Sequence, residues 1–241
     1  DLPVPNKRKA ELMIPFQLEE NLPFSPENIH LTSQIHKKDK SSFAQITIVE
    51  KDYFSELYSY LNNQNILPAV MTTELYSLQA YITHHKMTGN YCFLDIGHET
   101  TKAYFVHNGL VVANHVSHIA GSSIDEVIAQ TYDIPLDEAI VYKQENGFFL
   151  TEQQYEHVNE DQRKFAKLMK QTFWPLVLEL RRWEVGHRIK HGQQIEKVFL
   201  TGGTAHINNI EYFLGEHVNV PVEHFYPYTD LNYDIVGIDD E

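Results

Sequence analysis

Apolar positions along the chain recur with two periods, one typical of strands and one typical of amphipathic helices. Before residue 90 this pattern predicts a small α+β unit. Its expected elements are a helix over 7–21, strands over 28–36 and 43–49, a helix over 51–63, a short strand over 66–71 and a helix over 73–85. The tyrosine-rich stripe of the helix over 51–63 is expected to lie in the core.

The run YCFLDIGHETTKAYFV, residues 91–106, predicts a buried strand, a tight glycine turn and a second strand. Asn108-Gly109 favours a hairpin turn into a third strand over 110–116. Gly97 tolerates positive φ and close approach, so the backbone N–H groups of 97–101 can point at an anion. Asp95 at the strand end is suited to hold magnesium, directly or through water. The alternative is a hairpin whose Asp and Gly only shape a turn.

A second apolar run ends in glycines at VFLTGGTA, residues 198–205, before a helical pattern that carries Ile207, Ile210 and Phe213. We expect Leu94 and Phe199 to lie in one sheet, so that the two turns face each other across one nucleotide. Between the turns, the pattern predicts helices from Gly121, over 135–145, over 162–172 and from a restart at Pro175. A final strand over 218–225 is expected to be interrupted at Pro221.

Composition narrows the function classes. The net charge of −14 argues against a nucleic-acid partner and against charge-driven binding to anionic lipid. The 14 histidines are scattered without an HExxH motif, which favours solvated histidines over a metal site. A single cysteine, Cys92, cannot form an internal disulfide and fits a reducing cytosol. We find neither a secretory signal nor a run of apolar residues long enough to span a membrane.

Four segments carry a family resemblance. LDIGHETTK resembles the second phosphate motif of the actin/Hsp70/FtsA/sugar-kinase superfamily, and VFLTGGTAHI resembles its adenosine motif. IPLDEAIVYK and AELMIPFQLEENLPFSPENIHL resemble segments of the PilM-like branch, the actin-fold proteins of type IV pilus assembly, to which the GspL cytoplasmic domain is related. The resemblance covers nearly the whole chain.

The resemblance implies an α/β fold of the actin-like ATPase (ribonuclease H-like) type, with a mixed sheet, flanking helices and a smaller α+β lobe. It divides the chain into residues 1–88, the small lobe and connecting helix, and residues 89–241, the second actin-like domain. The superfamily also has an N-terminal subdomain with its own phosphate turn, for which we find no counterpart here. We therefore expect weak or no binding of the implied cofactors, ATP and Mg²⁺, by this chain.

The resemblance also implies a set of nucleotide-binding residues and no catalytic residue. The implied set is Asp95, Gly97, Glu99, Thr100 and Thr101 of the phosphate motif, Gly121, Lys143, and Gly202, Gly203, Thr204 and Ala205 of the adenosine motif, with Asp95 also holding the metal. There are departures from the family pattern. Ile140 stands where the family often has Glu, which predicts a missing ribose contact. Thr204 and Asn209 replace glycines, which predicts a narrower adenine slot.

The predicted function is a cytoplasmic actin-like scaffold of a type IV pilus or type II secretion inner-membrane platform. It is expected to bind ATP in the full-length protein, to be held at the inner membrane through partners and to be at most a weak ATPase. The alternative is a GspL-type structural platform with a vestigial nucleotide site. A sugar or acetate kinase is less favoured, because we find no catalytic acid near the turns.

Expected partners are the N-terminal cytoplasmic segment of a PilN-like inner-membrane protein, a secretion ATPase or a second copy of the chain, and not nucleic acid. The residues around Pro15 are more apolar than one amphipathic helix needs, which suggests an exposed contact surface. Phe16 and Phe24 are the predicted anchors. The alternative is that these residues pack on the strand over 43–49 or on the N-terminal subdomain of the superfamily.

Overall fold

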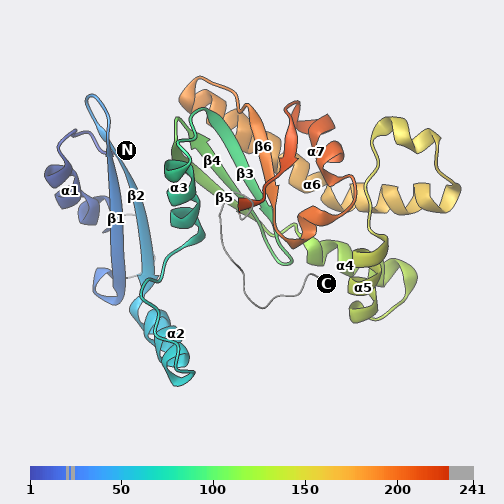
Figure 1. Ribbon diagram of the computed structural model, residues 1–241, viewed down its shortest axis with the longest axis horizontal. Coiled ribbons are helices and arrows are strands. Elements are labelled where there is room, and N and C mark those ends of the chain that lie inside the picture. The colour runs from blue at the N-terminus through green and yellow to red at the C-terminus, as the bar shows by residue number, and fades with distance from the viewer. Residues whose placement is uncertain (20–21, 23–24, 228–241) are drawn as a thin grey trace. The chain divides into compact units, whose positions relative to one another are not determined.

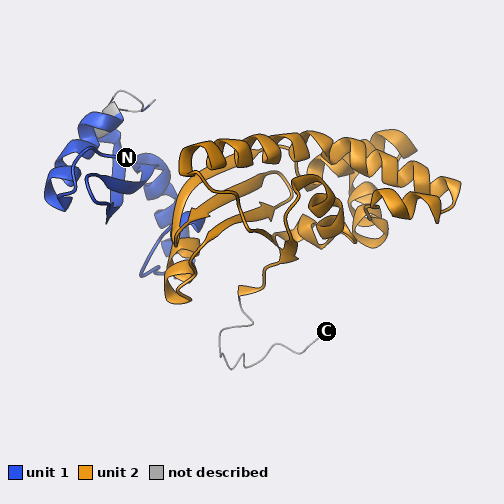
Figure 2. Ribbon diagram, turned by 90° about the horizontal axis from the view of Figure 1, so that it is seen from above, with its two compact units in different colours: residues 1–76 blue, residues 77–241 orange. Residues whose placement is uncertain are grey.

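The computed structural model describes residues 1–19, 22 and 25–227. The chain divides into two compact units, Asp1–Tyr76 and Ser77–Glu241, each of which is described by itself (Figure 2). The division falls within helix α3 (Glu74–His84), which the sequence analysis assigned whole to the first part. Phe24, one of the two predicted partner anchors, lies outside the described residues.

The first unit is a two-stranded antiparallel sheet with two helices. Strand β1 (Ile29–Lys37) pairs with β2 (Ser42–Glu50), and a short 3₁₀ helix, η1 (Pro26–Asn28), precedes β1. Helix α1 (Lys7–Glu19) buries Ala10 and Ile14, which are one turn apart, together with Leu2. This small core also packs against Ile46 of β2. Helix α2 (Lys51–Asn63) follows β2 directly.

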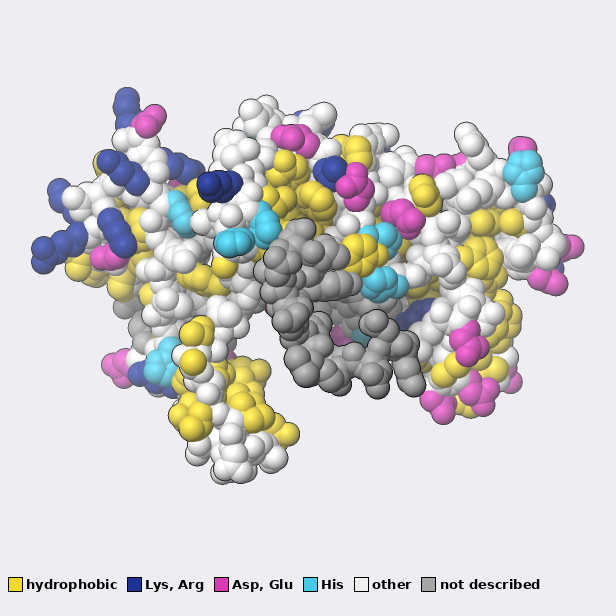
Figure 3. Space-filling view, viewed as in Figure 1, with side chains coloured by type: hydrophobic (Ala, Val, Ile, Leu, Met, Phe, Trp, Pro, Cys, Tyr) yellow, Lys and Arg dark blue, Asp and Glu magenta, His cyan; other side chains and the backbone are white. Residues whose placement is uncertain are grey.

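Two expectations for this unit were wrong. Residues 66–71 form no strand, because Pro68 lacks the N–H that a ladder needs and β1 pairs only with β2. Helix α2 has no buried residue among those described, so its aromatic stripe does not form core. Tyr53 and Tyr58 of this stripe are 62% and 42% exposed. Figure 3 shows hydrophobic side chains gathered over α2.

The second unit contains a five-stranded mixed sheet in the order β5-β4-β3-β6-β7 (Figure 1). Its strands are β3 (Asn90–Ile96), β4 (Thr101–His107), β5 (Leu110–Ser117), β6 (Lys197–Thr201) and β7 (Val222–His224). Strands β3, β4 and β5 form an antiparallel meander, whereas β6 lies parallel to β3. Phe93 pairs with Phe199 and Leu94 with Leu200, which confirms that the two apolar runs share a sheet.

Helices cover this sheet and enclose the main core. They are α4 (Gly121–Tyr132), α5 (Leu136–Asn146), the 3₁₀ helix η2 (Glu152–Glu156), α6 (Glu160–His191), the 3₁₀ helix η3 (Gly203–His206) and α7 (Ile210–Val218). The core contains Phe105 of β4, Phe173 of α6 and Phe213 of α7. Cys92 lies wholly within it, and burial raises the pKa of its thiol, so this cysteine is a packing residue.

Two other expectations in this unit differ from the structure. Helix α6 runs without a break through Pro175, where a restart was predicted. Phe173, Leu176 and Val177 are all buried around this exposed proline, and their burial outweighs the lost backbone hydrogen bond. The final strand is only three residues long, because α7 continues to Val218 and Asn219 then ends it in a left-handed conformation.

Candidate functional site

The sheet places the two glycine turns next to each other. Strands β3 and β6 are neighbouring and parallel, and Asp95 lies opposite Thr201 at their carboxyl ends. Each strand then leads directly into its glycine, Gly97 or Gly202. Ligand sites in sheets of this kind lie beyond the carboxyl ends of parallel strands.

Backbone hydrogen bonds hold the first turn against the start of α4. The Gly97 N–H donates to the Thr100 carbonyl oxygen over 3.0 Å, and the Gly97 carbonyl oxygen accepts the Gly121 N–H over 3.0 Å. The His98 carbonyl oxygen accepts the Ser122 N–H over 2.7 Å. The positive end of the α4 dipole therefore lies beside the first turn, where it favours an anion.

The predicted phosphate residues that follow this turn face different surroundings. Thr101 is fully buried, and its hydroxyl donates to the Ile119 carbonyl oxygen over 2.7 Å. This hydroxyl shapes the hairpin rather than facing an open site. Glu99 is exposed, and Thr100 is half-buried.

Two of the predicted glycines lie where a side chain has no room. A Cβ at Gly121 would meet Thr204 Oγ1 and lie 3.1 Å from Lys143 Nζ. Gly202 has φ of +93°, and a Cβ there would meet Asp95 Oδ1 and the Ile96 carbonyl group. Glycine is therefore required at both positions by close approach of the other segments.

Lys143 is held inside the unit by α4. Its Nζ donates to Asp125 Oδ2 over 2.6 Å and to the Gly121 carbonyl oxygen over 3.1 Å. His98 Nδ1 lies 3.6 Å from the same carboxylate oxygen. Asp125 Oδ1 is buried and has no hydrogen-bond partner among the described residues. Sequence reasoning missed Asp125, although it is the residue that sets the position of Lys143.

The second turn contributes an open position and a buried one. Nothing lies within 4 Å of a Cβ built on Gly203, so the chain leaves space there. Thr204 is buried, and its hydroxyl donates to the Gly97 carbonyl oxygen over 2.8 Å. Ala205 is also buried, and its N–H donates to the Gly202 carbonyl oxygen.

A cavity of about 320 Å³ opens between α5 and the second turn. It is lined by His98, Ile140, Lys143, Gln144, Gly147, Gly203, Thr204, His206, Ile207 and Asn208. The cavity thus brings together Lys143, Gly203 and Thr204 of the predicted set. Asp95, Gly97, Gly121 and Gly202 are not part of its lining.

Sequence reasoning did not single out Gln144, Gly147, His98 or His206 of the lining. Gln144 and Gly147 recur with Ile140 and Lys143 at helical spacing, so the face of α5 that lines the cavity is visible in the sequence. His98 and His206 carried no such signal beyond their position next to the glycine turns.

A second hollow lies within the first unit and is mostly apolar. Its volume is about 440 Å³, and Leu31, Val49, Phe54, Leu57 and Met71 form its apolar walls. We call it the β1–α2 groove. Phe16, the other predicted anchor, is not part of it and is 72% exposed on α1.

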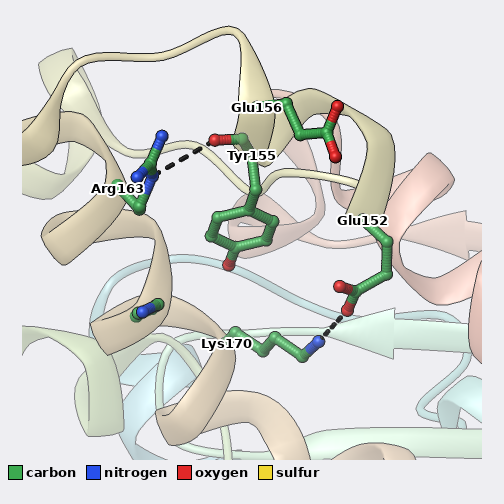
Figure 4. Close-up of a pocket in the computed structure, with 6 residues that line it drawn as sticks. Glu152, Tyr155, Glu156, Arg163 and Lys170 are labelled. Carbon is green, nitrogen blue, oxygen red and sulfur yellow. Dashed lines mark hydrogen bonds and ion pairs between the residues drawn. The ribbon is translucent and has the colours of Figure 1, made fainter.

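A third hollow, of about 410 Å³, lies between η2 and α6 and is lined by Tyr155 and by charged side chains (Figure 4). Lys170 forms an ion pair with Glu152, and Arg163 donates to the Tyr155 carbonyl oxygen. None of the predicted site residues lines it. Within the described part of the chain, we find no cluster of three potential metal ligands and no helix long and apolar enough to span a membrane.

Comparison with solved structures identifies the fold. MreB5 of Spiroplasma citri bound to AMPPNP aligns with a TM-score of 0.53 and 16% identity, over 73% of this chain and 60% of that chain. The MamK double helical filament aligns with a TM-score of 0.53 and 12% identity, over 71% of this chain and 59% of that one. The protein therefore has an actin-like α/β fold, as predicted.

The family follows from two further comparisons. A structure described as the PilM-PilN type IV pilus biogenesis complex aligns with a TM-score of 0.76 and 19% identity, over 96% of this chain. Residues 6–236 match the family described as type IV pilus assembly protein PilM, and the chain belongs to this family. It spans 66% of the solved PilM-PilN chain. A search of curated proteins gives no significant match.

Proposed function

We propose that this PilM-like type IV pilus assembly protein is a scaffold of the inner-membrane platform that binds an adenine nucleotide in its second unit and a partner segment on its first. The observation that carries the nucleotide proposal is that residues of both glycine turns and the lysine of α5 line one cavity, while hydrogen bonds join the first turn to the start of α4.

The cavity has the properties that a nucleoside needs. Its volume lies in the range of small-molecule sites. Ile140 and Ile207 provide apolar wall for a base, Gly203 leaves space beside them, and Lys143 provides positive charge. The phosphates would lie towards the first turn, where the positive end of the α4 dipole favours anions.

Magnesium fits this arrangement as a nucleotide-borne ion. Asp95 is the carboxylate at the end of β3, beside both glycine turns. Mg²⁺ commonly binds through one or two carboxylates while keeping water and phosphate ligands, so a single Asp is sufficient. When bound, the ion would neutralise phosphate charge, and Asp95 would orient it. No carboxylate lines the cavity itself, which supports slow hydrolysis at most.

The partner proposal rests on the first unit. The solved relative is described as a complex with PilN. The β1–α2 groove and the exposed tyrosines of α2 form an apolar surface suited to a short PilN-like segment. Binding of such a segment would hold this protein at the inner membrane from the cytoplasmic side. Phe16 remains a proposed anchor on the separate surface of α1.

One observation favours a second candidate, a structural platform with a vestigial nucleotide site. Asp125 pairs with Lys143 at 2.6 Å and so neutralises the charge that a nucleotide would use. The two candidates differ in whether a nucleotide binds at all.

A titration with MgATP decides between the two candidates. Binding is detected as changes in the chemical shifts of the backbone amides in nuclear magnetic resonance. We expect weak binding by this chain, with the largest shifts at Gly97, Gly121 and Gly203. Gly203→Val should abolish them by filling the open position. The matched control is Gly186→Val on α6, where a Cβ also meets nothing within 4 Å. No shift at millimolar MgATP, or equal shifts in both variants, would contradict the nucleotide proposal and favour the platform.

A further inference from the structure

The hydroxyl of Thr204 connects the two glycine turns. Its Oγ1 donates to the Gly97 carbonyl oxygen over 2.8 Å, and the residue is only 7% exposed. The same carbonyl oxygen accepts the Gly121 N–H over 3.0 Å. A single backbone oxygen of the first turn therefore holds both the second turn and the start of α4.

This contact lies within a continuous chain of hydrogen bonds. Thr204 Oγ1 occupies the space that a side chain at Gly121 would need. The Gly121 carbonyl oxygen accepts from Lys143 Nζ over 3.1 Å, and Lys143 also donates to Asp125 over 2.6 Å. The chain of hydrogen bonds runs from the second turn through the first turn and α4 to α5, so it joins these four segments.

We propose that Thr204 is a positioning residue whose hydroxyl sets the separation of the turns at 97–101 and 202–205 before any ligand binds. This role differs from the direct nucleotide contact that the family resemblance implies, because the hydroxyl faces Gly97. A site whose walls are already fixed loses less conformational freedom on binding, which raises affinity. The effect on affinity rests on the proposed nucleotide function, whereas the fixed separation does not.

Amide hydrogen exchange in the ligand-free chain tests the positioning directly. Thr204→Val removes the hydroxyl at nearly constant volume, and we expect the Gly97 and Gly121 amides to exchange about fivefold faster, the effect of losing one net hydrogen bond. Thr204→Ser keeps the hydroxyl and should exchange like the unaltered protein. The control is Thr172→Val on α6, which removes a similar bond, from Oγ1 to the Leu168 carbonyl oxygen over 2.9 Å.

Unchanged exchange in folded Thr204→Val, or equally fast exchange in Thr204→Ser, would overturn the proposal. If the valine variant does not fold, the unaltered protein still decides the question. Its Thr204 hydroxyl proton should be protected from exchange with water and visible by nuclear magnetic resonance. A hydroxyl proton that exchanges freely would overturn the proposal.

Titration with MgADP separates this inference from the proposed function. If the unaltered chain binds MgADP, Thr204→Val should bind it several-fold more weakly, and equal binding would overturn the effect on affinity. If no variant binds MgADP, the proposed nucleotide function fails, while the exchange rates still decide whether Thr204 fixes the turns.

Discussion

Lys143 Nζ lies 2.6 Å from Asp125 Oδ2, and their side chains are only 8% and 1% exposed. A buried ion pair of this kind is costly to break, because the remaining charge has neither water nor a partner. Lys143 lines the candidate cavity, and the pair gives it a fixed orientation.

Asp125→Ala should therefore lower the free energy of unfolding by about 3–5 kcal/mol, because it leaves the Lys143 ammonium buried and unpaired. Urea denaturation followed by circular dichroism measures this loss. The double variant Asp125→Leu, Lys143→Met removes both charges and should recover much of the stability. A single variant within about 1 kcal/mol of the unaltered protein would show that the pair is solvated.

Gly202→Ala is predicted to destabilise the protein more than Gly192→Ala. Both glycines have positive φ, +93° and +73°, so alanine is strained at either position. Only at Gly202 would the new Cβ also meet Asp95 Oδ1 and the Ile96 carbonyl group, whereas nothing lies within 4 Å at Gly192. Thermal unfolding measures the loss of stability in each variant. Gly192→Ala reports backbone strain alone, and Gly202→Ala reports the same strain together with steric overlap. Equal losses would contradict the close packing of the two turns.

Stability should fall in mild acid because of His187. The pKa of His187 is lowered to about 4, chiefly by burial and to a smaller extent by the neighbouring His191, His107 and Lys190. Its ring stacks on Phe105, and neither ring nitrogen has a partner among the described residues. The unfolded chain takes up a proton near pH 6.5, but the folded protein does so only near pH 4. The contribution of neutral His187 to the free energy of unfolding is complete above pH 6.5 and is lost as the pH falls towards 4.

His187→Phe keeps the stacking and removes the titration, so its free energy of unfolding should depend less on pH between 6.5 and 4. The difference in slope is at most about 1.4 kcal/mol per pH unit, the value for one proton. His157→Phe, at an exposed position, serves as the control. Identical slopes for His187→Phe and the unaltered protein would refute this origin of acid sensitivity.

Partner binding should depend on the β1–α2 groove. Leu57→Asp places a charge in the apolar wall of the groove. The ligand is a labelled peptide that carries the N-terminal cytoplasmic segment of a PilN-like protein. The variant should bind this peptide at least about tenfold more weakly. Ser59→Asp, at an exposed polar position of the same helix outside the groove lining, is the matched control. Fluorescence anisotropy gives the affinities, after circular dichroism has shown that both variants fold.

The same assay tests the α1 surface. Phe16→Asp should weaken binding if this exposed phenylalanine is an anchor. Normal affinity in folded Phe16→Asp together with weak binding in Leu57→Asp would assign the contact to the groove alone. Normal affinity in both variants would remove the first unit as the partner surface.

The sequence was sufficient to predict the strands and turns that short-range patterns determine. Two apolar runs that each end in glycine predicted the neighbouring strands β3 and β6, and the Asn108-Gly109 pair predicted the hairpin into β5. The prediction from sequence failed where tertiary packing determines whether a helix continues. Pro175 is tolerated inside α6 because buried neighbours hold the helix on both sides.

The candidate site shows the same limit. The glycines of both turns are recognisable locally, because close approach demands glycine there. The bond from Thr204 to Gly97 and the ion pair of Asp125 with Lys143 join residues far apart in the sequence. Such pairings depend on the fold, and no local pattern specifies them.

The central claim is that the turns at 97–101 and 202–205 share one adenine-nucleotide pocket with α5. Photolabelling with an azido-adenine nucleotide, followed by peptide mass spectrometry, tests it most directly. The account predicts labels on the cavity walls, within residues 140–147 and 203–208, that excess ATP removes and Gly203→Val prevents. Labels that ATP removes from the η2–α6 hollow or from the first unit instead would contradict it.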